Sequence, residues 1–165
     1  MILYVNADNF TPSTKLYIPT GEIKSVEGTP MDFRTPHALG DSIQSSFDQI
    51  QNATGYDHNF CLNTYKDGKG DDTQICASLY SPKTGIFMEM FTNEPGVQVY
   101  SGNFQGVGRD AEIIRKHGLK YPKHVSVCLE SQKYPDSPNQ KDWVQPVLNP
   151  GEKYYSHAAY KFSVK

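Results

Sequence analysis

The sequence lacks the features that would assign it to several large classes of protein. Its formal net charge over 165 residues is −2, and its Lys and Arg residues are scattered, so no basic face is available for the phosphate backbone of a nucleic acid. No stretch approaches the ~20 apolar residues of a membrane span. Met1–Val5 is apolar but lacks the basic leader and the ~7–15-residue apolar run of a signal peptide. We therefore expect a cytoplasmic protein with no nucleic-acid or membrane partner.

Cysteine is scarce as well. The three cysteines, Cys61, Cys76 and Cys128, are odd in number, and no pair has Cys-x-x-Cys spacing. This pattern predicts neither a disulfide framework nor a zinc site. Buried free thiols in a reducing compartment are the interpretation that fits best, and we expect no metal.

What the sequence does contain is typical of a mainly β protein. A chain of this length suits one domain, and 11 Tyr and 8 Phe favour strands. Short alternating segments separated by Gly- and Pro-containing turns predict antiparallel strands over residues 1–7, 73–80, 86–92, 97–100 and 154–164.

One short amphipathic helix is predicted over residues 41–52. Ile43, Phe47 and Ile50 fall at helical spacing, and Asp41 with Gln44 three residues later resembles a capping box. A second helical turn or two is expected over residues 110–117.

Residues 56–63 alternate with the period of a strand. Asp57 and Asn59 share a face that looks wet or ligand-facing, whereas His58 falls on the apolar face with Tyr56 and Phe60. We interpret His58 as a hydrogen-bonded residue in apolar surroundings rather than a ligand.

In the strand over residues 97–100, Gln98 and Tyr100 point to one face and the two valines to the other. Gln98 could bind a polyol or merely a neighbouring backbone group.

Residues 124–132 also alternate, and they present a single carboxylate. Val125, Val127 and Leu129 share one face, so Glu130 points to the other, at the end of the predicted strand and among small polar neighbours. A carboxylate on a rigid strand with no Lys or Arg beside it is a candidate general base. The alternative is an ordinary solvated Glu, since most Glu side chains are exposed.

Several segments spread over the whole chain resemble the galactose mutarotase (aldose 1-epimerase) family, in the order in which that family has them. They are Pro19–Glu22, Gly55–Phe60, Asn93–Phe104, Cys128–Gln132, Tyr134–Asp136, Pro150–Glu152 and Tyr160–Val164. The resemblance covers only the C-terminal half of the family's sequence. It implies an antiparallel β-sandwich with an open sugar-binding face, and no cofactor or metal.

The resemblance also implies a reaction and roles for three residues. The family interconverts the α and β anomers of free hexoses such as galactose and glucose by opening and closing the sugar ring. Glu130 matches the general base that removes the proton of the anomeric hydroxyl. Asp57 and Gln98 match positions that hydrogen-bond the sugar hydroxyls.

The family's general acid, a His in an Asn-His-(Ser/Thr)-Tyr-(Phe/Trp)-Asn segment, is missing from this sequence. A positioned acid or base supplies typically ~10²–10⁴-fold. We therefore expect residues 1–165 to form a single domain without the family's N-terminal half, and the isolated chain to be weakly active or inactive. Met1 falls inside a strand, which suggests a truncated or split gene product or a partial chain. A separate N-terminal half or self-association could cover the exposed edges.

Three other functions remain open from the sequence. The main one is a non-catalytic carbohydrate-binding or regulatory module that uses Asp57, Gln98 and the aromatic residues. An epimerase of hexose 6-phosphates would need cations for the phosphate, and no clustered Arg supports it. An interaction remnant without a ligand is the third.

Overall fold

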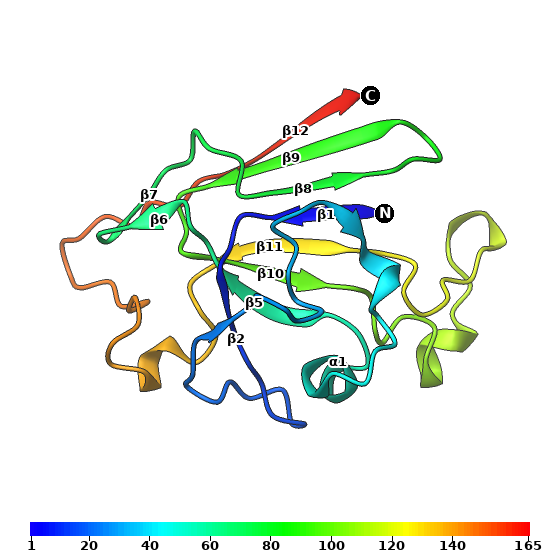
Figure 1. The fold of residues 1–165 in the computed structure, drawn as a ribbon, viewed down its shortest axis with the longest axis horizontal. Coiled ribbons are helices and arrows are strands. Elements are labelled where there is room, and N and C mark those ends of the chain that lie inside the picture. Colours follow the sequence, from blue (N-terminus) through cyan, green and yellow to red (C-terminus); the bar gives the residue numbers. More distant parts are fainter.

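The computed structural model describes residues 1–165, and its centre is two five-stranded antiparallel sheets that pack face to face (Figure 1). The first sheet has the strand order β12-β9-β8-β1-β4. Its strands are β1 Ile2–Val5, β4 His37–Ala38, β8 Ala77–Tyr80, β9 Ile86–Thr92 and β12 Ala158–Val164.

The second sheet has the order β11-β10-β5-β2-β3. Its strands are β2 Asn9–Thr11, β3 Lys24–Ser25, β5 Asp57–Cys61, β10 Gly96–Tyr100 and β11 Cys128–Gln132. A separate small hairpin joins β6 Tyr65–Lys66 to β7 Lys69–Gly70. The predicted antiparallel β-sandwich is therefore confirmed.

One core lies between the two sheets because each sheet turns its apolar side chains inward. Leu3 and Met90 from the first sheet belong to the same buried cluster as Phe60, Val97 and Val99 from the second. The period-two alternation predicted for residues 97–100 is confirmed, since Val97 and Val99 are fully buried while Gln98 points outward.

The α-helix is shorter than predicted. α1 spans Asp48–Ala53, so the expected helix over residues 41–52 is wrong in its first half. The N-cap is Phe47, with no side-chain hydrogen bond, and the predicted capping box does not form. Ile43 and Phe47 still pack against the core, from irregular chain. These side chains are buried without a helical backbone. A six-residue helix gains little stability, because few hydrogen bonds follow the costly first turn.

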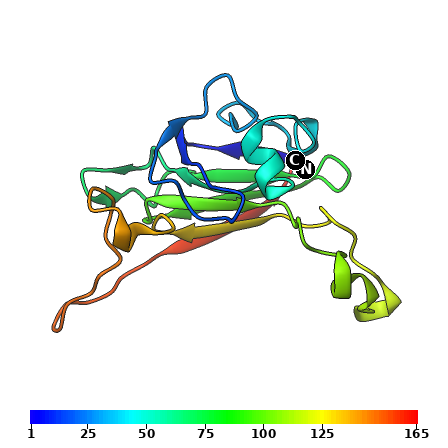
Figure 2. The same ribbon diagram turned by 90° about the horizontal axis from the view of Figure 1, so that it is seen from below.

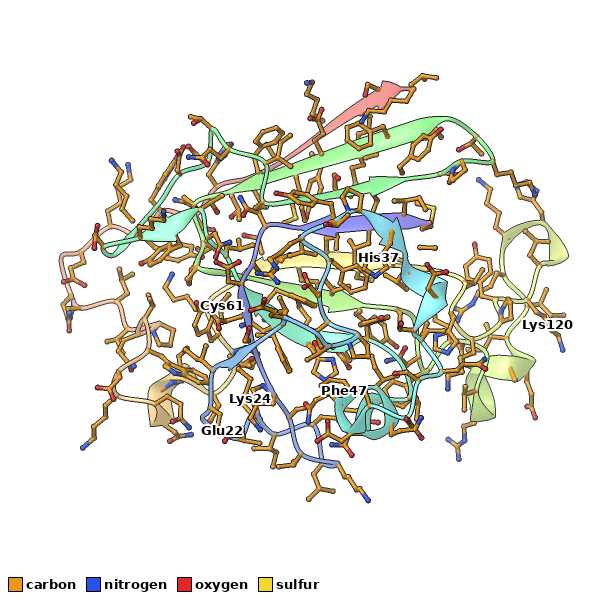
Figure 3. The ribbon with its side chains drawn as sticks, in the orientation of Figure 1. Glu22, Lys24, His37, Phe47, Cys61 and Lys120 are labelled. Atoms are coloured by element: carbon orange, nitrogen blue, oxygen red, sulfur yellow. The ribbon has the colours of Figure 1, made fainter.

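The remaining helical elements are single 3₁₀ segments. They are η1 Leu39–Asp41, η2 Gly108–Glu112, η3 Lys116–Gly118 and η4 Ser137–Asn139. η2 and η3 occupy the stretch where one or two helical turns were expected. They lie in a loop that projects from one end of the sheets, while the chain between β11 and β12 projects from the other end (Figure 2). Lys120 marks the first of these loops in Figure 3.

Several strand boundaries differ from the prediction: β1 ends at Val5 rather than at residue 7, and β5 covers Asp57–Cys61 rather than residues 56–63. β8 begins at Ala77 rather than Thr73, β12 begins at Ala158 rather than Tyr154, and β11 begins at Cys128. The alternation from His124 onward therefore continues beyond the strand, and Val125 is half exposed. Glu130 is consequently the third of five residues in β11, not its end.

His58 lies on the inner face of β5, as the alternation predicted. Its ring is fully buried, packs edge-on against Phe10, and accepts a hydrogen bond at Nδ1 from the Asp57 backbone N–H at 3.1 Å. Its Nε2 has no partner. Burial disfavours the charged ring and lowers the pKa of His58 from 6.5 to about 4.

The burial of His58 predicts a stability loss in mild acid. Because the pKa is lower in the folded state than in the unfolded state, protons bind the unfolded chain preferentially below pH 6.5. Between pH 7 and pH 5 this group should cost about 2 kcal/mol of the free energy of unfolding.

Urea unfolding at several pH values measures this effect, with His58→Asn as the comparison. That variant keeps an acceptor for the Asp57 N–H and does not titrate, so its stability should depend less on pH over this interval. Equal pH dependence in the two proteins would contradict the assignment.

Candidate active site

The outward faces of β5, β10 and β11 form one continuous polar surface, which we call the polar face. In the register of these strands Gln98 lies opposite Asn59 on one side and Glu130 on the other, and Tyr100 lies opposite Asp57. The polar face consists of Asp57, Asn59, Cys61, Gly96, Gln98, Tyr100, Cys128, Glu130 and Gln132. Cys61, at the end of β5, is labelled in Figure 3. The three residues predicted to form the site thus share one face of three adjacent strands.

Asp57 and Gln98 are in direct contact. Gln98 Nε2 donates a hydrogen bond to Asp57 Oδ1 at 2.8 Å. Partial burial raises the pKa of Asp57, and the hydrogen bond from Gln98 opposes that rise. The pair therefore presents one fixed acceptor and one fixed amide to whatever occupies the polar face.

Glu130 is exposed on this face and forms no ion pair with any Lys or Arg. Its neighbour on the same face is Cys128. Burial raises the pKa of the Cys128 thiol, and the negative charges of Glu130 and Asp57 raise it further. Both carboxylates therefore act on the same small region, with Glu130 the more accessible of the two.

Gln132 adds two hydrogen bonds on the polar face, a role that the alternation of residues 124–132 does not predict. Its Nε2 donates to Gln98 Oε1 at 3.0 Å and to Asn59 Oδ1 at 3.2 Å. The sequence feature that could have indicated this role is the position of Gln132 two residues after Glu130, which places both side chains on the same face of a strand. That spacing alone does not distinguish a site residue from a solvated one.

Gly96 provides the space that Asn59 occupies. A Cβ at residue 96 would lie 2.2 Å from Asn59 Oδ1 and 3.0 Å from the Tyr134 ring. The Asn59 side chain is buried and crosses directly over this backbone. A glycine is therefore required for Asn59 to reach Gln132.

Replacing Gly96 by Ala should lower the free energy of unfolding by about 1–3 kcal/mol, since the added methyl displaces the buried Asn59 amide. Urea denaturation measures the loss. Gly40→Ala is the matched control, because a Cβ at that position meets nothing within 4 Å. Equal stability of the two variants would contradict the close packing at Gly96.

No histidine belongs to the polar face. His58 points into the core, His37 stacks on Phe33 with 4.5 Å between ring centroids (Figure 3), and His157 contacts Asp72. His124 contacts the Ser101 carbonyl oxygen through Nδ1, and His117 lies in η3. The polar face itself supplies carboxylates, amides, one phenol and thiols.

The surface hollows lie away from the three predicted residues. A hollow of about 420 Å³ reaches the polar face only at Gln132, and Asp57, Gln98 and Glu130 line none of the hollows. The polar face is thus open at Glu130 and buried at Asn59 and Cys61. No group of three or more His, Cys, Asp or Glu side chains is arranged to bind a metal ion. None of the helices has the length and apolar character needed to cross a bilayer.

Comparison with known proteins gives one consistent result. The sequence model of the family described as Aldose 1-epimerase matches residues 2–161. The chain is 41% identical over 160 residues to galactose mutarotase from Bos taurus, covering 97% of this chain and 43% of that protein. It is 35% identical over 164 residues to aldose 1-epimerase from Escherichia coli K12, covering 97% of this chain and 44% of that protein. It therefore spans less than half the length of these relatives.

Solved structures agree on the fold. The galactose 1-epimerase of Lactobacillus acidophilus matches with a TM-score of 0.78 and 27% identity, over 99% of this chain and 43% of that one. A GalM/aldose epimerase homologue from C. elegans matches with a TM-score of 0.80 at 24% identity, over 99% of this chain and 45% of that one.

Proposed function

Because this chain belongs to the aldose 1-epimerase family, we propose that its polar face acts on the α and β anomers of free hexoses such as galactose and glucose, in hexose metabolism. The observation that carries the proposal is the gathering of Asp57, Gln98 and Glu130 on one face of three adjacent strands. The absence of Lys and Arg among the nine residues of that face favours a neutral sugar over a sugar phosphate.

The mechanism assigns one chemical step to Glu130. Its exposed carboxylate removes the proton of the anomeric hydroxyl, the bond between C1 and the ring oxygen breaks, and the ring oxygen takes up a proton. Rotation about C1–C2 and closure of the ring then give the other anomer, with Glu130 returning its proton. Asp57 and Gln98 hold the sugar hydroxyls, so that C1 stays beside Glu130.

The proton for the ring oxygen needs a second group, and the five histidines of this chain lie off the polar face. We therefore propose that residues 1–165 alone turn sugar over weakly or not at all. The lack of a cavity around Asp57, Gln98 and Glu130 supports this, because such a site does not exclude water from a bound sugar.

The uncovered side of the sandwich supports a need for further β structure. β11 and β12 each pair along one edge only. On β12, Tyr160, Phe162 and Val164 share the core-side face with Met90, yet they are 46%, 65% and 80% exposed. A separate N-terminal half or a second copy of the chain would cover these side chains.

Titration of the ¹⁵N-labelled chain with D-galactose tests the site directly. We expect the amide resonances of β5, β10 and β11 to shift as sugar is added, while those of β1 and β8 do not. Shifts confined to other elements would contradict the proposal. Complete insensitivity to sugar would instead favour a remnant without a ligand.

A non-catalytic carbohydrate-binding module remains the second candidate, because no histidine on the polar face can act as the general acid. In that case the same resonances shift, but no anomer is turned over. Glu130 separates the two functions, since a binding module does not depend on a base.

A further inference from the structure

We propose that Gln132 is a positioning residue that fixes the orientation of the Gln98 amide. The site it would serve rests on the proposed function. The hydrogen-bond pattern can be tested without any sugar.

Gln132 uses both N–H groups of its side-chain amide. A side-chain amide has two N–H groups on one nitrogen. Gln132 Nε2 lies 3.0 Å from Gln98 Oε1 and 3.2 Å from Asn59 Oδ1. Both hydrogens are therefore used on neighbouring oxygens, and turning the Gln132 amide over would place oxygen against oxygen at both contacts.

The hydrogen bonds that link Gln132, Gln98 and Asp57 run in one direction. An ionised carboxylate only accepts hydrogen bonds, so Gln98 must present Nε2 to Asp57 Oδ1, 2.8 Å away. Gln98 Oε1 then faces Gln132. Asp57 at one end and Gln132 at the other thus agree on a single orientation of the Gln98 amide.

The Gln98 amide keeps hydrogen-bonding positions that a ligand can use. Gln98 keeps one N–H and one acceptor position that are not used within the protein. A sugar hydroxyl bonded to Gln98 therefore meets a donor and an acceptor in fixed places. Without Gln132, the amide of Gln98 would keep only its bond to Asp57.

Burial makes the arrangement stiff. Asn59 is 1% exposed, and its Nδ2 has no hydrogen-bond partner. The only side-chain bond it makes is the one that Oδ1 accepts from Gln132. An unpaired buried donor costs free energy. If Gln132 is replaced by an acceptor, turning the Asn59 amide over therefore lowers the free energy, because Nδ2 gains a partner.

The replacement Gln132→Glu supplies that acceptor with almost the same shape. The new carboxylate can accept from Asn59 Nδ2 and from Gln98 Nε2, so the Gln98 amide then lies between two acceptors, Asp57 and residue 132, and has no single favoured orientation. The neutral variant Gln132→Met removes both donors without adding charge. Besides Asp57, the ionisable side chains on the polar face are Cys61, Tyr100, Cys128 and Glu130.

The test follows the side-chain amide resonances of Gln98 by ¹⁵N NMR during a pH titration. In the wild type these resonances should follow the titration of Asp57, because Nε2 is bonded to that carboxylate. In Gln132→Glu they should respond to the titration of residue 132 as well as to that of Asp57, because the Gln98 amide no longer has one orientation. In Gln132→Met the affinity for D-galactose should fall about tenfold, as expected for one weakened hydrogen bond, while the overall fold is unchanged.

Gln44→Glu provides the matched control, because it makes the same change of charge outside the polar face. If the Gln98 amide responds to Asp57 alone, and equally in the wild type, Gln132→Glu and Gln44→Glu, the positioning role is overturned. If the Gln98 amide loses its single orientation in Gln132→Glu but the wild type does not bind galactose, the positioning role stands and the proposed function fails.

Discussion

Replacing Glu130 by Gln should remove the acceleration of galactose mutarotation that the wild-type chain provides once the segment of a galactose mutarotase outside the match to this chain is added. A positioned general base contributes typically ~10²–10⁴-fold to a rate, and the amide of Gln cannot take up the anomeric proton at neutral pH. The substitution preserves the size of the side chain on an exposed position in the middle of β11. The fold and the contact between Asp57 and Gln98 should therefore remain.

The variant separates catalysis from binding when both are measured. We expect Glu130→Gln to bind galactose with an affinity within a few-fold of the wild type, while its mutarotation rate equals that of buffer. Glu112→Gln is a suitable control, since Glu112 is exposed in η2 on the projecting loop. With that segment present, an acceleration by Glu130→Gln equal to that of the wild type would exclude Glu130 as the base.

Replacing Asp57 by Ala should weaken galactose binding about 10- to 100-fold. A hydrogen bond to a charged group contributes about 1.5–3 kcal/mol, which corresponds to this range of dissociation constants. The loss has two parts, because Asp57 accepts from Gln98 Nε2 in the free protein and is proposed to accept from the sugar as well.

The isosteric variant Asp57→Asn distinguishes these two parts. Its side-chain oxygen can still accept from Gln98, so the amide of Gln98 stays in place, but the negative charge is gone. We expect an affinity between those of the wild type and Asp57→Ala in isothermal titration. Identical affinities for all three proteins would show that the sugar does not contact Asp57.

The sequence predicted the layout of the polar face because strand periodicity is a local property. Val97 and Val99 are buried for the same reason that Gln98 points outward. β9 begins at Ile86 and ends at Thr92, as predicted, because Gly85 and the preceding turn define its start. The same alternation predicted that Asp57 and His58 point to opposite faces of their strand.

Other features depend on contacts distant in sequence, which periodicity does not contain. The prediction of a helix over residues 41–52 was wrong in its first half, because Ile43 and Phe47 reach the core from an irregular backbone. The role of Gln132 depends on Asn59, 73 residues away, and on the missing side chain of Gly96. The roles of Glu130, Asp57 and Gln98 in sugar chemistry came from family resemblance, and they stay predictions.

The most direct test of the account is polarimetry of freshly dissolved α-D-galactose. The rate of approach to anomeric equilibrium is measured with the wild-type chain and with Glu130→Gln, each with and without the segment of a galactose mutarotase that lies outside the match to this chain. We predict a small or undetectable acceleration by the wild-type chain alone, a clear acceleration once the segment is added, and none with Glu130→Gln in either case. Equal acceleration by both chains, or none by the wild type even with the segment, would contradict the central claim that Glu130 is the base of an aldose 1-epimerase site.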